Sequence, residues 1–301
     1  MSPAIEALGR FDPFGGPGEA GGGLAYLVLD VFTSTPLEGN QLAVFLDGRG
    51  MEAEAMQALA RELKLSETVF MLPAEGPADG RIRIFTPTAE LPFAGHPTLG
   101  SAAVLAGALG RDRVLLETGA GPVEVDFEER GRREARGWMG QPLPSWEPFG
   151  ARDELLAALG LEASGLPVEV YCNGPRHVYV ELPSREAVAA LEPDIGALGR
   201  LGELGVSCFA GSEGAFKSRM FAPGLGVAED PATGSAAGPL AVHLARHGRI
   251  AFGQEIKIEQ GAEIMRPSLL RARALGSRAH LERVEVGGSA VIVAAGHFWI
   301  R

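Results

Sequence analysis

The sequence predicts an α+β fold of two similar halves, each a β-sheet curled around one central helix. The first observation is a duplication, since residues 83–103 and 219–237 share Arg-x-Phe-x-Pro and then Pro-x-x-Gly-Ser-Ala-Ala. Such internal similarity at this separation indicates two like halves rather than a solenoid of short repeats. The second observation is that each half has several strand-like runs and one helix of small residues. Segregated strands around a single helix favour the α+β class.

The elements of the first half follow from composition and period. Apolar or alternating runs predict strands, and residues 51–63 carry apolar side chains at helical spacing. A helix of small residues is expected after the repeated loop, ended by Gly110, because glycine is common just beyond a helix C-terminus. The expected strands are residues 24–32, 42–46, 66–72 and 81–85, a hairpin at 114–127, and the central helix is 97–109.

The second half repeats this order. Its expected strands are residues 168–171, 177–182, 205–210, 216–221, 255–259, 268–275 and 291–299. Its expected helices are 152–159, 184–191, 195–202 and 236–247. We therefore expect a first half at 24–140 and a second at 141–290, with the last strand, near 291–301, pairing with the first half. Residues 1–23 are rich in Gly and Pro and are expected to be a flexible extension outside the fold.

Composition excludes several classes. The chain has 301 residues, 46% hydrophobic and 22% charged, which is typical of a soluble globular protein. Its net charge of −11 argues against nucleic acid or an anionic membrane as partner. Only two cysteines occur, Cys172 and Cys208, so no disulfide framework is expected and a cytoplasmic location is favoured. Neither a signal peptide nor a membrane-spanning run is expected.

The duplicated loop has the features of a ligand site. Each copy passes from a strand through Pro and Gly residues into the start of a helix, expected at Pro97 in one copy and near Ala232 in the other. The first turn of a helix has unpaired N–H groups and a partial positive charge, so it can bind a carboxylate or oxyanion. Gly95 allows a ligand to approach the backbone closely. We expect the two helix starts to meet at a cleft between the halves.

Three side chains are candidates for acid–base chemistry. His96 and Asp230 stand at matching points of the two copies, which suggests that the halves have specialised. A helix N-cap is the alternative role for Asp230, because Asp is a preferred capping residue. Glu67 enters an apolar strand, where burial is expected to raise its pKa and let it act as acid and base in turn. Its alternative is an ordinary solvated carboxylate at a strand edge.

Other patterns are weaker. His243 and His247 are spaced to share one helix face, as in a metal site, but no carboxylate follows them in a metalloprotease pattern. We therefore expect two histidines near a helix end and no metal. The cysteines are expected to be buried and apolar rather than reactive.

The motifs together resemble the PhzF family of phenazine-biosynthesis-type isomerases, which have the diaminopimelate epimerase-like fold. The matching segments include Ser66-Glu67-Thr68, Gly95-His96-Pro97-Thr98 and Glu229-Asp230-Pro231-Ala232-Thr233-Gly234-Ser235. The resemblance implies that Glu67 moves the proton and that His96, Asp230 and Ser235 line the cleft and orient the substrate. Gly95 and Gly234 would bind substrate at the positions where cysteine-using epimerases of this fold carry their thiols.

The sequence therefore predicts an isomerase that moves a proton on a small unsaturated carboxylic acid with one carboxylate as acid and base. No cofactor is expected, because a helix start can stabilise the negative charge of the substrate. An epimerase or racemase of the same fold is one alternative, which the absence of thiols at Gly95 and Gly234 disfavours. A protein that binds a ligand without turnover is the other. The resemblance also implies a homodimer, and the substrate itself stays open.

Overall fold

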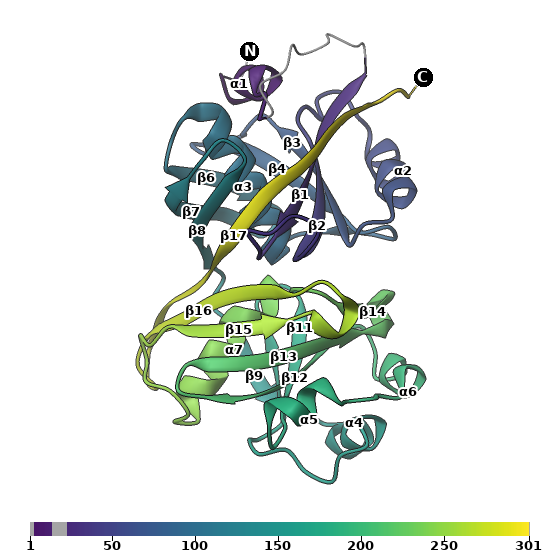
Figure 1. Ribbon diagram of the computed structural model, residues 1–301, viewed down its shortest axis with the longest axis vertical. Coiled ribbons are helices and arrows are strands. Elements are labelled where there is room, and N and C mark those ends of the chain that lie inside the picture. Colours follow the sequence, from purple (N-terminus) through teal and green to yellow (C-terminus); the bar gives the residue numbers. More distant parts are fainter. Residues whose placement is uncertain (1–2, 14–22, 301) are drawn as a thin grey trace. The chain divides into compact units, whose positions relative to one another are not determined.

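In the computed structural model, which describes residues 3–13 and 23–300, the chain forms two compact units (Figure 1). The first unit comprises residues up to Gly140 together with those from Gly287 onward, and the second comprises Gln141–Val286. Each unit is a mixed sheet with a helix against it, so the expected α+β class with two like halves is correct.

The strands of the first unit form a sheet that closes on itself. Around the sheet the neighbours are β17, β1, β2, β3, β4, β6, β7, β8 and again β17. The β2–β3 and β4–β6 pairs are parallel, and a helix connects the two strands of each pair. The strands are β1 Leu24–Val31, β2 Asn40–Phe45, β3 Glu67–Leu72, β4 Gly80–Phe85, the two-residue β5 Glu90–Leu91, β6 Arg113–Thr118, β7 Gly121–Arg130, β8 Glu134–Gln141 and β17 Leu281–Phe298.

Helix α3 (Gly95–Leu109) fills the centre of this curled sheet. It contacts β1, β2, β3, β4, β6 and β7, and most of its residues are buried. Small side chains make this possible. A Cβ added at Gly100 would lie 2.6 Å from Cδ2 of Leu42, so only glycine fits there without a shift. The helix ends at Gly110 with φ of 67°, the left-handed conformation expected of glycine at that position.

The expectation that residues 1–23 lie outside the fold is wrong for the first part of the segment. Helix α1 (Pro3–Arg10) buries Ala4, Ile5 and Leu8 and contacts α3. Phe11 follows the helix and lies over Gly107, since a Cβ at that glycine would meet the Phe11 ring at 2.9 Å. Apolar residues on one helix face therefore hold this segment to the unit despite the nearby Gly and Pro. Residues 14–22, also within this expectation, lie outside the described residues.

The second unit repeats the order of strand pairing. From β9 the neighbours run through β10, β11, β12, β13, β15 and β16, with the β11–β12 and β13–β15 pairs parallel. The sequence of antiparallel and parallel pairs from β10 to β16 matches that from β1 to β7. The strands are β9 Ser145–Pro148, β10 Glu169–Cys172, β11 Arg176–Glu181, β12 Gly205–Ser212, β13 Ala215–Ala222, β14 Val227–Asp230, β15 Ile256–Gln260 and β16 Ser268–Gly276.

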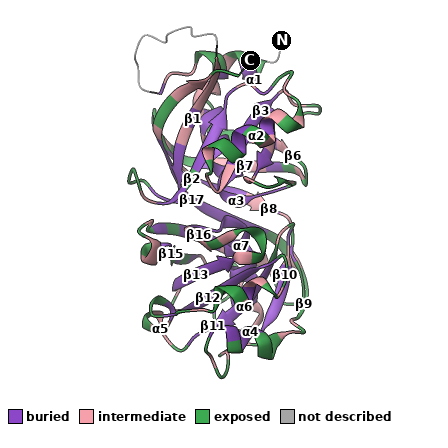
Figure 2. Ribbon diagram, turned by 90° about the vertical axis from the view of Figure 1, so that its right-hand side faces the viewer, coloured by how far each residue is buried: buried purple, intermediate pink, exposed green. Residues whose placement is uncertain are grey.

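Helix α7 (Gly234–Arg246) is the counterpart of α3 and is buried along nearly its whole length. Three shorter helices pack on the same unit: α4 (Arg152–Ala158), α5 (Arg185–Ala189) and α6 (Ile195–Gly199). In the first unit, α2 (Ala53–Leu63) connects the parallel strands β2 and β3. Exposed residues mark the outward faces of α2 and α4 (Figure 2). None of the described helices is both long and apolar enough to span a bilayer.

Two differences from the sequence-based expectation affect the site. Helix α7 starts at Gly234, not near Ala232, and Asp230 ends strand β14 four residues earlier. Aligned on their helix starts, the two copies therefore match Gly95 with Gly234 and His96 with Ser235. Asp230 is not the N-cap of α7 either, because Thr233 occupies that position.

Candidate active site

In the first unit, Glu67 and His96 form a close pair. Glu67 is the first residue of β3 and His96 the second residue of α3, so a strand start and a helix start bring them together. His96 Nε2 lies 3.3 Å from Glu67 Oε2, and only 5% and 16% of the two side chains are exposed. The structure thus joins two of the residues expected from the sequence to act as acid and base.

The protonation of His96 follows from its surroundings. Burial lowers its pKa to about 3, and a hydrogen bond to the backbone of Gln41 only partly offsets this effect, so the ring is neutral near pH 7. The hydrogen bond with Gln41 raises the pKa of His96, so a ring N–H of His96 donates to the Gln41 carbonyl. Among the described residues, Nε2 has no hydrogen-bond partner of acceptable geometry, so Nδ1 makes that bond. The Nε2 lone pair of His96 therefore faces Glu67.

The start of α3 offers few backbone donors. Pro97 has no N–H, and the N–H of Thr98 bonds to the carbonyl of Ala94 at 3.3 Å. The N–H groups of Gly95 and His96 are therefore the ones at this helix start that an anion could accept. The α7 start is similar, because the carbonyl of Thr233 accepts the N–H groups of both Ala236 and Ala237.

In the second unit, a buried glutamine holds the loop that carries Asp230. Gln260, on β15, donates to the Asp230 carbonyl at 2.8 Å and to Thr233 Oγ1 at 3.0 Å. Thr233 Oγ1 in turn donates to the Asp230 carboxylate. These bonds fix both ends of the short segment between β14 and α7, so the Asp230 carboxylate has a defined position.

The first turn of α7 is held by side chains from neighbouring strands. Pro239 lies inside the helix and has no N–H, so the carbonyl of Ser235 lacks its usual helical donor. Asn173 Nδ2 donates to that carbonyl at 3.0 Å. Gln141 and Tyr179 donate to the carbonyls of the residues on either side, Gly234 and Ala236, at 2.8 and 2.7 Å.

A second buried histidine meets the Ser235 side chain. His177, the second residue of β11, is 2% exposed, and its Nε2 lies 3.0 Å from Ser235 Oγ. Burial lowers the pKa of His177 to about 4. In each unit, therefore, the second residue of the central helix lies beside a titratable side chain at the start of a strand: Glu67, the first residue of β3, and His177, the second residue of β11.

Sequence reasoning missed the supporting residues of the second unit. Gln141, His177 and Gln260 are ordinary polar residues in strand patterns, and nothing local marks them as buried. Pro239 within an otherwise helical stretch was an available signal, because a proline there requires another donor for the carbonyl it leaves unpaired.

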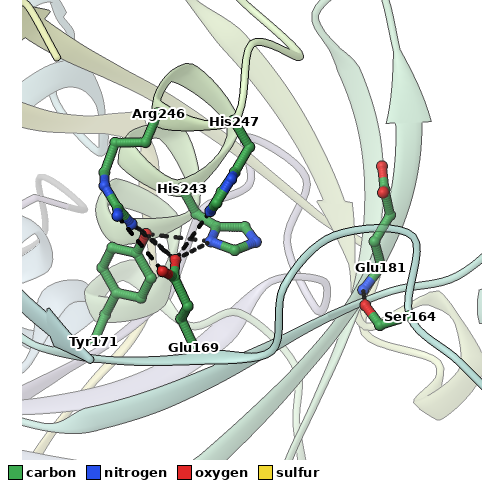
Figure 3. Close-up of polar contacts among 7 residues, drawn as sticks. All are labelled: Ser164, Glu169, Tyr171, Glu181, His243, Arg246 and His247. Atoms are coloured by element: carbon green, nitrogen blue, oxygen red, sulfur yellow. Dashed lines mark hydrogen bonds and ion pairs between the residues drawn. The ribbon is translucent and has the colours of Figure 1, made fainter. Parts of the chain in front are cut away.

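Away from these groups, a carboxylate lies beside His243 and His247. Glu169, on β10, lies 3.3 Å from His243 Nδ1 and 3.0 Å from His247 Nε2 (Figure 3). The ligand-capable atoms of the three lie within 4.8 Å of one another. Arg246 also donates to Glu169 at 2.7 Å, and Tyr171 contacts both. Burial disfavours the charge of Glu169, but hydrogen bonds from His243, Arg246 and His247 lower its pKa overall. Arg246 thus balances the carboxylate charge from within the chain.

The buried carboxylate–imidazole pair at a helix start has the groups that an acid–base isomerase or epimerase needs to move a proton on a ligand. The family model described as phenazine biosynthesis-like protein matches residues 29–296. A trans-2,3-dihydro-3-hydroxyanthranilate isomerase from Pseudomonas chlororaphis is 51% identical over 90% of this chain and 98% of its own length. The crystal structure of a PhzF-family protein from Bacillus anthracis has a TM-score of 0.81 and 24% identity, covering 92% of this chain and 99% of that one.

The chain belongs to the PhzC-PhzF family, and it is a proton-moving isomerase. The expected diaminopimelate epimerase-like fold is also correct. A proline racemase from Agrobacterium radiobacter has the same fold with a TM-score of 0.62, at 14% identity and over 92% of this chain and 93% of that one.

Proposed function

We propose that the protein isomerises trans-2,3-dihydro-3-hydroxyanthranilate or a close analogue, with Glu67 as the single acid and base. The observation that carries this proposal is the buried Glu67–His96 pair, 3.3 Å apart at the start of α3. The name and the 51% identity of the relative from Pseudomonas chlororaphis support the choice of substrate.

The named substrate suits a single carboxylate. The dihydro ring has two saturated carbons, C2 with the amine and C3 with the hydroxyl, and a diene conjugated to the carboxylate. Glu67 removes the C3 proton, the C3–H electrons form the C3–C4 double bond, and the C4–C5 double bond moves to C5–C6. The electrons of the C6–C1 double bond then take the same proton from Glu67 at C1. The product is an enol that becomes a ketone by a proton shift from oxygen to C4, so atoms and electrons balance without a redox cofactor.

His96 assists by stabilising the state in which Glu67 holds the substrate proton. With Nδ1–H donated to Gln41, the unprotonated Nε2 of His96 lies 3.3 Å from Glu67 Oε2, where it can accept a hydrogen bond once the carboxyl is protonated. Because the His96 ring is already neutral, the pair works without first losing a proton from imidazole.

The remaining expected residues bind and orient the substrate. The backbone N–H groups at the helix starts, at Gly95 and Gly234, donate hydrogen bonds to the carboxylate of the substrate. Ser235 donates a hydrogen bond to it, and the Asp230 carboxylate, held by Thr233 and Gln260, accepts one from the substrate amine or hydroxyl. Both glycines are the first residues of their helices, where a two-thiol racemase would need cysteines.

We further propose that the protein is a cytoplasmic homodimer that needs no cofactor. Two unpaired cysteines, Cys172 and Cys208, suit a reducing compartment. Light scattering of the purified protein would give twice the mass of one chain, and a single-chain mass would refute the dimer. Full activity of metal-free protein after dialysis against a chelator is expected, and a loss restored by a metal would refute independence from metals.

The decisive experiment follows proton movement in deuterated water. We expect the wild-type enzyme to convert 2,3-dihydro-3-hydroxyanthranilate and to label the product at C1 to an extent set by exchange of the Glu67 proton. Glu67→Gln removes the base and should lower kcat at least about a thousandfold. Glu62→Gln is the matched control, since Glu62 is an exposed residue of α2 in the same unit.

Two results would contradict the proposal. Turnover by folded Glu67→Gln within tenfold of the wild type would show that another group moves the proton. Binding of the acid by the wild type without any product or labelled carbon would indicate a ligand-binding protein instead of an enzyme.

A further inference from the structure

His177 lies outside the residues that the family resemblance assigns to the reaction. It stands near the start of β11, pairs with Gly205 of β12, and is buried. Its Nε2 is 3.0 Å from Ser235 Oγ, the only hydrogen bond of that hydroxyl among the described residues. Either His177 Nε2 or Ser235 Oγ can be the donor in this hydrogen bond, and the direction decides whether the Ser235 hydroxyl can donate to a substrate.

The ring of His177 carries a single N–H. Burial lowers its pKa to about 4, so the imidazole is neutral at the pH of the cytoplasm. Only one ring nitrogen then bears a proton. Either Nε2–H donates to Ser235 Oγ, or Ser235 O–H donates to a bare Nε2 and the proton of the ring is on Nδ1.

The surroundings of Nδ1 decide between these two tautomers. Within the described part of the chain, Nδ1 has no hydrogen-bond partner. It faces Gly205 and the thioether of Met220, because a Cβ added at Gly205 would lie 2.8 Å from both Nδ1 and the Met220 sulfur. A buried N–H without a good acceptor is costlier and rarer than a buried lone pair without a donor. The proton therefore belongs on Nε2, which donates to Ser235.

This direction fixes what Ser235 can do. With its oxygen accepting from His177, the Ser235 hydroxyl proton must point elsewhere, as a donor to a ligand. The backbone of Ser235 is also held, since Asn173 donates to its carbonyl and Pro239 excludes the usual helical donor. Both the position of the oxygen and the direction of its proton are set before a ligand arrives.

We propose that His177 is a positioning residue, which orients the Ser235 hydroxyl as a hydrogen-bond donor to the carboxylate of the substrate. The role in binding rests on the function proposed above, whereas the direction of the hydrogen bond is a property of the free protein. Gly205 contributes to this arrangement, because a side chain at that position would collide with the ring of His177.

The first test needs no substrate. In long-range proton–nitrogen spectra of the wild-type protein labelled with ¹⁵N-histidine, we expect His177 as the neutral Nε2–H tautomer, with its Nε2 signal shifted in Ser235→Ala. The Nδ1–H tautomer, or a charged ring at pH 7, would overturn the proposal. Either spectrum is interpretable even if Glu67→Gln proves active and the proposed function is wrong.

Steady-state kinetics form the second test. His177→Leu removes the donor, and we expect KM to rise about fivefold to tenfold with kcat within twofold of the wild type, the loss of one hydrogen bond to the substrate. His177→Gln places an amide N–H near the position of Nε2 and should restore most of the affinity. His280→Gln is the control, because His280 is an exposed histidine in the same unit.

An unchanged KM in His177→Leu, or a His177→Gln variant as impaired as His177→Leu, would overturn the positioning role. If His177→Leu does not fold, the tautomer of the wild-type ring and the KM of His177→Gln decide the question.

Discussion

The two copies of the repeated loop have the same ion pair at different depths. Arg83 binds Glu90 with two contacts of 2.7 Å, and Arg219 binds Glu229 with contacts of 2.9 and 2.8 Å. Each guanidinium also lies over a phenylalanine ring, at 5.2 and 5.0 Å. The first pair is 27% and 42% exposed, but the second is only 10% and 11% exposed. The duplication therefore preserved the geometry of this ion pair, while its exposure to solvent diverged between the two copies.

The helix starts differ in the polar side chains that they carry. The second residue of α3 is His96, which faces a carboxylate, and the second residue of α7 is Ser235, which faces a neutral imidazole. The first helix start thus has a carboxylate–imidazole pair, and the second has a hydroxyl next to a neutral imidazole. Under the proposed function, the first unit carries the residues that move the proton and the second carries a residue that binds substrate.

The largest expected effect concerns the buried ion pair. Arg219→Leu leaves Glu229 buried without its partner and takes a donor from the Leu191 carbonyl, so we expect a loss of about 4 kcal/mol in the free energy of unfolding. Arg83→Leu, at the exposed pair, should cost about 1 kcal/mol or less. Urea unfolding measures both. Equal losses would contradict the difference in solvation, and Arg219→Leu with Glu229→Leu should recover much of the stability.

Acid should destabilise both units through their buried histidines, and His177 provides the test in the second unit. Burial lowers the pKa of His177 to about 4 in the folded protein, against an ordinary value of 6.5. Between pH 4 and pH 6.5, therefore, His177 is protonated in the unfolded chain but neutral in the folded protein. Its contribution to stability is present above about pH 6.5 and is lost as the pH falls, by about 3 kcal/mol at pH 4. We expect His177→Gln to lose about that much less stability between pH 7 and pH 4 in denaturant titrations. An identical pH slope in variant and wild type would contradict the buried neutral ring.

The smallest of these effects tests the division of labour itself. His96→Ser gives α3 the residue that α7 has, and it should lower kcat about a hundredfold because the acceptor for protonated Glu67 is lost. Ser235→Ala should instead raise KM about fivefold to tenfold and leave kcat nearly unchanged. Steady-state kinetics on 2,3-dihydro-3-hydroxyanthranilate separate these outcomes. A rise in KM alone for both variants would show that the units do not divide the tasks in this way.

Local patterns predicted much of the fold and half of the candidate site. Residues 66–72 and the Gly95 to Pro97 segment are marked by apolar runs and by a helix-start pattern, and the structure brings Glu67 and His96 together from them. Register between the two copies was harder to predict. Proline is allowed in the first turn of a helix and also in a loop before it, so Pro97 and Pro231 align in sequence while only Pro97 is helical.

The buried polar residues could not be predicted for a different reason. Gln141, Asn173 and His177 act on α7 from strands far away in the sequence, and their burial depends on the whole sheet. The helix at residues 3–10 is hard to predict because it adjoins a Gly- and Pro-rich segment at residues 13–23, although Ile5 and Leu8 share a helix face.

The long last strand has a consequence for how the chain is made. The first unit needs β17, whose Phe298 pairs with Leu24 of β1, while the second unit is the continuous segment Gln141–Val286 (Figure 1). During synthesis the edge of β1 therefore stays unpaired until β17 has emerged from the ribosome. All residues of the second unit, which ends at Val286, are synthesised before β17 is complete. Unpaired strand edges invite association with other chains. We expect newly made chains to be most prone to aggregation just before the final strand pairs with that edge.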